Sequence, residues 1–315
     1  GRRKIHKKRT PSLGGIGIFL GFFAALLIWM PFDDVQSYKY ILASISIIFF
    51  IGMRDDIVAL RPLYKLIGQI VAAIIVVKLA GVQLHSLYGL FGIESLPNWA
   101  GMTLSIFTII VITNSFNLID GLDGLAGTIA TIVLVSFGTW FFLIEEPLIS
   151  LLAFSMAGAV VAFLSFNWEP SKIFMGDTGA LVIGFLFSVL AIYFIDHNYS
   201  LPDNSVYKFE SSVTTAVCVI IIPLFDTLRI FILRLWKKQS PFTPDKNHMH
   251  HALMRLGMGH SKTALALGAL NVFYILVAIQ FRELEDNLML PIILVLSTGL
   301  SLLLDYLIIR RLKRG

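Results

Sequence analysis

The sequence contains little charge and almost no cysteine. Only 14% of its 315 residues are charged, and Cys218 is the single cysteine. One cysteine excludes an intrachain disulfide and a cysteine-based zinc site. With 57% hydrophobic residues and a mean hydropathy of +0.81, the composition also excludes an ordinary soluble domain. Because no convincing internal repeat or low-complexity tract is present, we expect one integral-membrane domain over residues 1–315.

Long apolar stretches recur along the whole chain. Ten of them are long enough, or nearly so, to cross about 30 Å of hydrocarbon. The sequence therefore predicts an all-α protein with about ten transmembrane helices. The predicted spans are 13–31, 38–53, 62–80, 100–116, 124–143, 148–166, 178–195, 211–235, 262–281 and 288–309.

The lysines and arginines are distributed unevenly. If all ten stretches span, both ends of the chain lie on one side, and 20 of the 25 basic residues fall on that side. The positive-inside rule makes this the cytosolic face. Such a face is expected to attract anionic membrane lipids. The predicted cytosolic loops are 1–12, 54–65, 117–123, 167–177 and 236–261.

One polar stretch, N-S-F-N-L-I-D-G-L-D-G-L at residues 114–125, interrupts an apolar run. Asn114, Asn117 and Asp120 are three residues apart, so a helix end would carry them on one face, and Asp123 continues the line. Amide and carboxylate oxygens suit a divalent cation, and the two glycines permit close approach of a bulky anion. The alternative is a polar turn with solvated carboxylates.

Other carboxylates on the same predicted face also interrupt apolar sequence. Asp55 and Asp56 directly follow a span, where acids are unfavourable because the helix dipole is negative. Paired carboxylates there could hold a cation, accept a proton or orient a nucleophile. Lys65 follows on the same side; an ordinary lysine snorkelling from a span is an equally good interpretation. Asp177, in F-M-G-D-T-G, suits a phosphate or metal site at a helix start and suits a helix N-cap equally well, and the two interpretations are compatible.

The longest predicted cytosolic loop contains P-D-K-N-H-M-H-H, with Lys246, His248, His250 and His251. Histidine clusters usually indicate zinc, but the missing cysteines and the nearby acids favour a harder ion. Histidines beside lysine also suit a nucleotide diphosphate, and a fortuitous cluster in a loop is the remaining alternative. The pattern P-L-F-D-T-L-R just before this loop predicts an intrahelical ion pair between Asp226 and Arg229.

Taken together, four blocks resemble the polyprenyl-phosphate N-acetylhexosamine-1-phosphate transferase family. They are the Asp55-Asp56 pair, residues 114–125, F-M-G-D-T-G at 174–179 and the histidine block at 244–251. The H-x-H-H form is similar to the bacterial branch that uses GlcNAc-1-phosphate, whereas the branch that loads phospho-MurNAc-pentapeptide usually reads H-H-H. Family members normally have one more span before Arg2, so we expect that this chain lacks an N-terminal span.

The resemblance implies transfer of a sugar-1-phosphate from a UDP-N-acetylhexosamine to undecaprenyl phosphate, with release of UMP. It implies Mg²⁺, or Mn²⁺, held by Asp177 and Asn117, and Asp55 or Asp56 taking a proton from the acceptor phosphate or aligning it. The implied substrate-binding residues are Lys65, Asn114, Asp120, Asp123, Lys246, His248, His250 and His251.

For the protein as a whole, the resemblance implies a multi-pass protein of the bacterial cytoplasmic membrane with a cytosolic active site. We expect no nucleic-acid partner, and the sequence is compatible with a homodimer. Two other classes are conceivable. A proton-coupled transporter would place its acids near the bilayer midplane. A CDP-alcohol phosphotransferase would need an Ala-Arg pair after the first Asp-Gly, which this sequence lacks.

Overall fold

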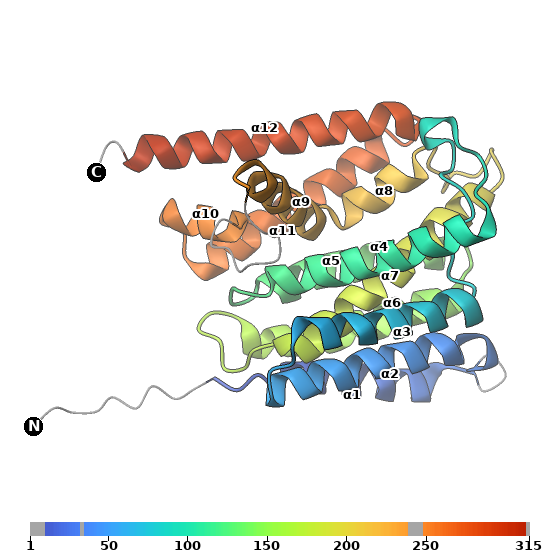
Figure 1. The fold of residues 1–315 in the computed structure, drawn as a ribbon, viewed down its shortest axis with the longest axis horizontal. Coiled ribbons are helices and arrows are strands. Elements are labelled where there is room, and N and C mark those ends of the chain that lie inside the picture. The colour runs from blue at the N-terminus through green and yellow to red at the C-terminus, as the bar shows by residue number, and fades with distance from the viewer. Residues whose placement is uncertain (1–9, 32–34, 239–247, 313–315) are drawn as a thin grey trace, which may run out of the picture.

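The computed structural model describes residues 10–31, 35–238 and 248–312, and within these ranges the chain is helical without strands. The helices are α1 (Gly14–Trp29), α2 (Val35–Ile57), α3 (Pro62–Leu79), the short 3₁₀ turn η2 (Leu90–Gly92), α4 (Asn98–Ile119), α5 (Leu125–Leu143), α6 (Pro147–Asn167), α7 (Gly176–Ser200), α8 (Ser212–Val219), α9 (Ile221–Trp236), α10 (Met249–Arg255), α11 (His260–Gln280) and α12 (Asp286–Leu312). Figure 1 shows most of the helices running side by side, with α9 crossing the others.

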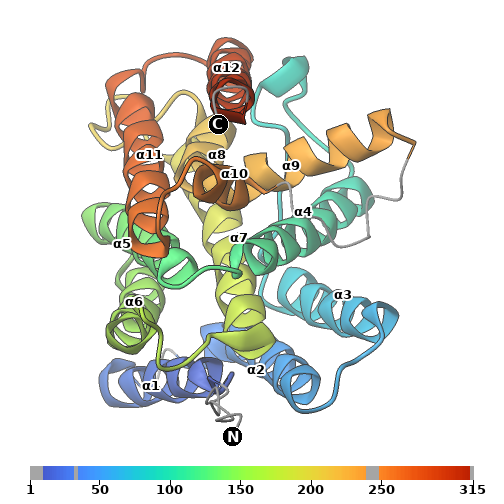
Figure 2. The same ribbon diagram turned by 90° about the vertical axis from the view of Figure 1, so that its left-hand side faces the viewer.

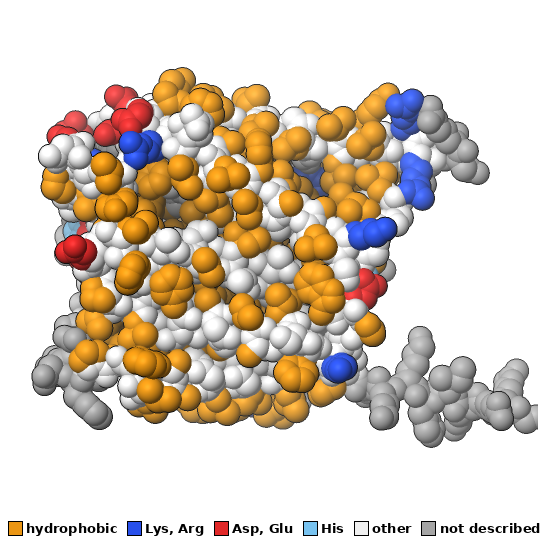
Figure 3. All heavy atoms as spheres, turned by 180° about the vertical axis from the view of Figure 1, so that it is seen from behind, with side chains coloured by type: hydrophobic (Ala, Val, Ile, Leu, Met, Phe, Trp, Pro, Cys, Tyr) orange, Lys and Arg blue, Asp and Glu red, His pale blue; other side chains and the backbone are white. Residues whose placement is uncertain are grey.

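The predicted all-α membrane architecture is confirmed, and each of the ten predicted spans is helical. Among the described residues, seven helices are both long and apolar enough to cross a bilayer. The helices α8 and α9 make an eighth span if the pair is counted as one, while α1 has only 16 residues. The number ten is therefore approximate. Figure 3 shows apolar side chains over the middle of one face, with most charged side chains towards its two ends.

The predicted span over residues 211–235 is a broken helix, because α8 and α9 meet at 90°. Pro223 has no N–H, so it cannot bond to the carbonyl of Val219 four residues earlier. That carbonyl instead accepts a hydrogen bond from Asn271 Nδ2 at 3.0 Å. The partner on α11 satisfies the buried carbonyl and thus allows the chain to turn.

Helix α7 lies at the centre of the bundle (Figure 2) and is buried along almost its whole length. Small residues let its neighbours approach closely, as is common between membrane helices. A Cβ atom at Gly52 of α2 would lie 2.6 Å from Thr178 Cα. One at Gly184 would lie 2.8 Å from the Thr113 carbonyl oxygen of α4. Helix α7 is therefore held tightly between α2 and α4.

Candidate active site

The sequence blocks converge at one end of the bundle. The C-terminal ends of α2 and α4 lie there with the N-terminal ends of α3 and α7, and α10 lies beside them (Figure 2). The residues that the sequence singled out in separate blocks therefore share one face of the protein. The contacts between them define the candidate site.

Asp56 caps the first turn of α7. Its Oδ1 accepts the backbone N–H of Asp177 at 2.9 Å, and its Oδ2 accepts the backbone N–H of Thr178 at 3.0 Å and the Thr178 hydroxyl at 2.5 Å. Gly176 has a φ of +72°, and a Cβ atom there would lie 2.6 Å from the Asp56 carboxylate. The interpretation of Asp177 as an N-cap is wrong, because the cap oxygens come from α2 and the N-cap residue, Met175, makes no side-chain cap bond.

Lys65 forms ion pairs with the carboxylates of both Asp55 and Asp177. Its Nζ lies 2.5 Å from Asp55 Oδ2 and 2.9 Å from Asp177 Oδ2. Asp55 Oδ1 also accepts the backbone N–H of Leu60 at 2.6 Å, which fixes the short connection between α2 and α3. The alternative of a snorkelling lysine is wrong, since the ammonium group pairs with carboxylates from two different helices.

The Asp-Gly-Leu-Asp-Gly loop between α4 and α5 lies close enough to Asp56 and Asp177 for their charges to act on Asp120. Burial, and then the negative charges of Asp177 and Asp56, raise the pKa of Asp120 to about 7. Asp123 lies 3.3 Å from His260 Nδ1, so its carboxylate is not simply solvated. The loop is held by Asn167, whose Oδ1 accepts the Gly124 N–H at 2.9 Å. The sequence analysis missed Asn167, because its local pattern does not differ from that of any polar residue at the end of a helix.

Of the two asparagines of α4, Asn114 is engaged by another amide. Its Nδ2 donates to Gln69 Oε1 at 2.6 Å, and its Oδ1 accepts from Gln69 Nε2 at 3.3 Å. Gln69 is a buried polar residue in the apolar helix α3, which was the available signal that sequence reasoning did not use. Asn117 lies one turn further towards the end of α4, and its backbone carbonyl accepts the Asp120 N–H at 3.4 Å.

His248 is bound by Asp226 and not exposed in a loop. Its Nδ1 lies 2.8 Å from Asp226 Oδ2, and Oδ1 of the same carboxylate accepts the Met249 N–H at 2.9 Å at the start of α10. The predicted Asp226–Arg229 ion pair is therefore wrong: Arg229 pairs with Asp305 of α12 instead. A single sequence did not reveal that the histidine block would fold back onto α9.

His250 connects the histidine block to the loop after α4. Its ring stacks on that of His248 with centroids 5.6 Å apart, and a Cβ atom at Gly121 would lie 3.4 Å from its Nε2. His251 lies next to it, with ring centroids 4.3 Å apart. Burial, followed by the charge of His251, lowers the pKa of His250 to about 4. Lys246 lies outside the described residues.

The chain is similar to known membrane transferases over most of its length. A model of glycosyl transferase family 4 matches residues 38–195. The chain is 30% identical over 304 residues to a probable undecaprenyl-phosphate N-acetylglucosaminyl 1-phosphate transferase of Bacillus subtilis (strain 168), covering 96% of this chain and 82% of the relative. The chain belongs to glycosyl transferase family 4. It is a phosphosugar transferase and a multi-pass membrane protein.

Two further relatives agree with this family 4 assignment. An undecaprenyl-phosphate alpha-N-acetylglucosaminyl 1-phosphate transferase of Yersinia pestis is 30% identical, covering 81% of this chain and 68% of the relative. A decaprenyl-phosphate N-acetylglucosaminephosphotransferase of Mycolicibacterium smegmatis (strain ATCC 700084 / mc(2)155) is 31% identical, covering 84% of this chain and 70% of the relative. The similarity thus extends well beyond the residues that the family model matches.

The site of this family 4 protein suits a hard divalent cation that also binds substrate phosphates. In the described ranges, no group of three or more His, Cys, Asp or Glu side chains is arranged to hold a metal ion. Mg²⁺ does not need such a group, because it commonly takes one or two carboxylates plus substrate phosphates and water. Burial and then the negative charges of Asp177 and Asp56 raise the pKa of Asp120, and a cation placed among these carboxyl groups would favour their ionised forms. The donor chemistry therefore fits.

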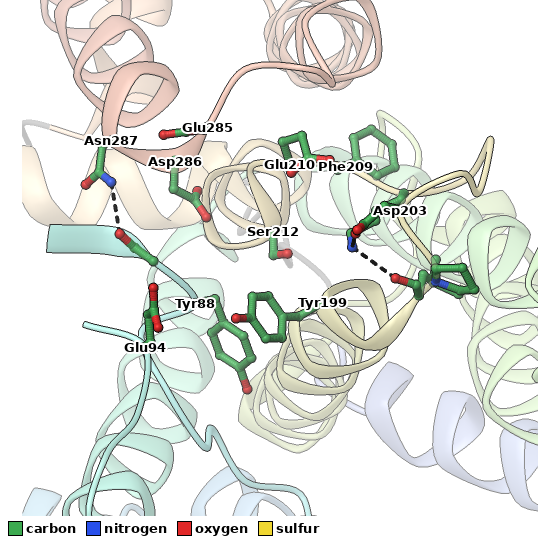
Figure 4. A pocket seen from close by; sticks show the side chains of 14 residues that line it. Tyr88, Glu94, Tyr199, Asp203, Phe209, Glu210, Ser212, Glu285, Asp286 and Asn287 are labelled. Atoms are coloured by element: carbon green, nitrogen blue, oxygen red, sulfur yellow. Dashed lines mark hydrogen bonds and ion pairs between the residues drawn. The ribbon is translucent and has the colours of Figure 1, made fainter. Parts of the chain in front are cut away.

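A cavity of about 770 Å³ lies at the opposite end of the bundle (Figure 4). It is formed by the connections on either side of η2, by the segment between α7 and α8, and by the start of α12. Asn287 donates to the Gly89 carbonyl at 2.9 Å across one wall of this cavity. None of the predicted site residues lines it, so cavity size does not locate the candidate active site.

Proposed function

We propose that this family 4 protein transfers N-acetylglucosamine-1-phosphate from UDP-N-acetylglucosamine to undecaprenyl phosphate and releases UMP. The printed activities of the relatives support the sugar and the polyprenyl acceptor. One observation carries the proposal to this chain: Lys65 lies between Asp55 and Asp177, on the face where His250 meets the Asp-Gly loop. This arrangement brings together the Lys65 ammonium group, carboxylates and histidines. Such a combination suits a metal-bound diphosphate substrate.

Asp177 and Asn117 would hold the magnesium ion, with Mn²⁺ as a substitute. When bound, the metal neutralises charge on the diphosphate and on the departing UMP. Asp177 is oriented for this by the Asp56 cap on its own backbone. Asp120, whose pKa responds to the charge of Asp177, adds another carboxyl group. The positive charge of the bound metal would favour the ionised form of this group.

The reaction is a direct displacement at phosphorus. An oxygen of the acceptor phosphate forms a bond to the phosphorus that carries the sugar, and the bond from this phosphorus to the bridging oxygen breaks. That oxygen leaves with UMP. A phosphate monoester has a second pKa near 6 and is mostly dianionic at pH 7, so a general base contributes little. Asp55 therefore acts mainly by orienting the acceptor, and the Lys65 ammonium group supplies positive charge for the phosphates.

His248, His250 and His251 would contact the diphosphate and the adjoining sugar, with Lys246, Asp123 and Asn114 completing the substrate contacts. Asp226 supports this role, because it fixes His248 Nδ1 and so leaves Nε2 as the nitrogen that faces away from α9. Most basic residues of the chain fall on the side of these loops, which supports a cytosolic active site in a bacterial cytoplasmic membrane.

Purified protein incubated with undecaprenyl phosphate and radiolabelled sugar nucleotides tests the proposal. We expect magnesium-dependent label transfer to lipid from UDP-N-acetylglucosamine and none from UDP-MurNAc-pentapeptide. Transfer only from the pentapeptide donor would contradict the proposed substrate. Exchange of UMP into UDP-sugar without acceptor would contradict direct displacement, since it requires a phospho-enzyme intermediate.

A further inference from the structure

Helix α12 contacts both elements that hold the histidines. It contacts α9, which carries Asp226, and it contacts α10, which carries His250. The matching family model ends at residue 195, well before α12 begins. The role of this last helix is therefore a separate question from the role of the site residues.

The contact with α9 is an ion pair within the apolar part of the bundle. Arg229 Nη2 lies 2.8 Å from Asp305 Oδ1 and 3.0 Å from Oδ2, and the Arg229 side chain is only 10% exposed. An ionised side chain in a membrane segment is costly unless it is paired. Removing the Asp305 carboxylate, whose side chain is 42% exposed, deletes a charge-assisted contact that joins α9 to α12. The pair therefore fixes α9 relative to α12.

The same helix places Asp226 three residues before Arg229, on the same face of α9. Asp226 binds His248 Nδ1 and caps α10 through the Met249 N–H. A rotation of α9 that broke the pair with Asp305 would also move the Asp226 carboxylate. The ion pair and the histidine contact are therefore mechanically linked through one turn of helix.

The contact with α10 is mainly apolar. Leu304 and Ile308, on either side of Asp305 along α12, form a small buried cluster with Ala252 of α10. Arg311, one turn further, donates from Nη1 to the carbonyl of Leu256 just after α10. Helix α10 has only seven residues, too few to be stable alone, so its position depends on these contacts together with the Asp226 cap.

We propose that α12 positions the histidine cluster, with Asp305 as a positioning residue that acts through Arg229 and Asp226 on His248 and His250. This inference rests on the proposed transferase function for its kinetic consequence. Its structural consequence, the protection of His250, does not depend on the reaction. Asp305 touches no substrate and is not a catalytic residue.

Two variants of the full-length protein test the proposal. Asp305→Asn removes the charge and keeps the shape, while Asp305→Glu keeps the charge. Asp203→Asn is the matched control, because it removes an ion pair with Lys208 at the opposite end of the protein. The first measurement is the rate at which diethyl pyrocarbonate modifies His250, mapped by mass spectrometry, with exposed His85 as the internal reference.

We expect Asp305→Asn to raise the His250 modification rate by roughly tenfold, because local opening exposes the ring. The kcat/KM for UDP-N-acetylglucosamine should fall about 10- to 100-fold, mainly through KM, because the histidines are displaced. Asp305→Glu should restore both values to within about threefold of wild type. The Asp203→Asn control should change neither.

Unchanged His250 modification and KM in Asp305→Asn would overturn the proposal. So would simultaneous reaction of the fully buried Cys218 with N-ethylmaleimide, because the effect would then be global unfolding. Ile308→Ala tests the apolar contact separately and should also expose His250. If wild-type protein transfers no sugar phosphate, the proposed function fails, while the His250 labelling still decides the role of α12.

Discussion

Asp56 holds the backbone of Asp177 from a different helix: its Oδ1 accepts the Asp177 N–H at 2.9 Å. Both oxygens of Asp56 are occupied in this way, by donors at the start of α7. A carboxylate at a helix N-terminus also interacts favourably with the helix dipole. Of the two adjacent aspartates, Asp56 thus positions Asp177, and Asp55 is the one paired with Lys65.

Asp56→Ala should destabilise the protein by about 1 kcal/mol, and at most about 2, because the first turn of α7 loses its cap. Turnover should fall as well, since the backbone that carries Asp177 is released. Thermal unfolding in detergent and steady-state kinetics measure the two effects. Thr178→Val, which removes only the hydroxyl donor to Asp56, should have a smaller effect on both. Unfolding of Asp56→Ala at the wild-type temperature would contradict the capping role.

Lys65→Met should lower kcat/KM by about 100-fold or more, as is typical when a charge-stabilising donor is removed. The methionine keeps the apolar stem but leaves Asp55 and Asp177 without the ammonium group between them. Lys78→Met, in the last turn of the same helix, is the matched control and should keep wild-type kinetics. Equal activity of the two variants would remove Lys65 from the site.

His250 should contribute less to the stability of the protein as the pH is lowered from about 6.5 to about 4. The raised pKa of Asp120 acts in the opposite sense, so the contribution of His250 is measured as the difference between wild type and a His250 variant. His250 has its pKa lowered from 6.5 to about 4, so in this interval the unfolded chain binds a proton that the folded chain does not. Thermal unfolding at several pH values measures the slope. His250→Asn should make the slope of stability against pH less positive, whereas His85→Gln, at an exposed position, should leave it unchanged. An unchanged slope in His250→Asn would contradict the burial of a neutral ring.

Asp177→Asn should abolish turnover at every magnesium concentration, because the amide lacks the charge that binds the ion. Treatment of wild-type protein with EDTA should also abolish turnover, and added Mg²⁺ or Mn²⁺ should restore it. Isotope transfer from UDP-N-acetylglucosamine to lipid measures both. Asp196→Asn, near the other end of α7, should respond to Mg²⁺ like wild type. Near-normal activity in Asp177→Asn would exclude it as a metal ligand.

The positions of the helices along the chain could be predicted from the sequence because apolar length is a local property. Runs of about 20 residues mark the spans without any knowledge of their partners. The common face of Asp55, Asp120 and Asp177 followed from the charge of the loops. What remained open was the role of each carboxylate, because a capping bond between residues 121 positions apart leaves no local pattern.

The break between α8 and α9 shows the same limit. Pro223 was visible in the sequence, but a proline near a helix start is ordinary. The turn also depends on Asn271, which donates a hydrogen bond to the carbonyl of Val219, 52 positions earlier. The histidine block likewise depended on Asp226, which local spacing assigned to Arg229 instead. In both cases the hydrogen-bond or ion-pair partner that decides the structure is distant in the sequence.

The close fit of α7 against Gly52 and Gly184 has a consequence for how substrates are accepted. A helix packed backbone against backbone on several sides cannot slide or tilt without collisions. The helix that carries Asp177 is therefore held rigidly in place. Any adjustment of this site to substrate is thus expected in α10, the seven-residue helix with His250, which is held by only a few side-chain contacts.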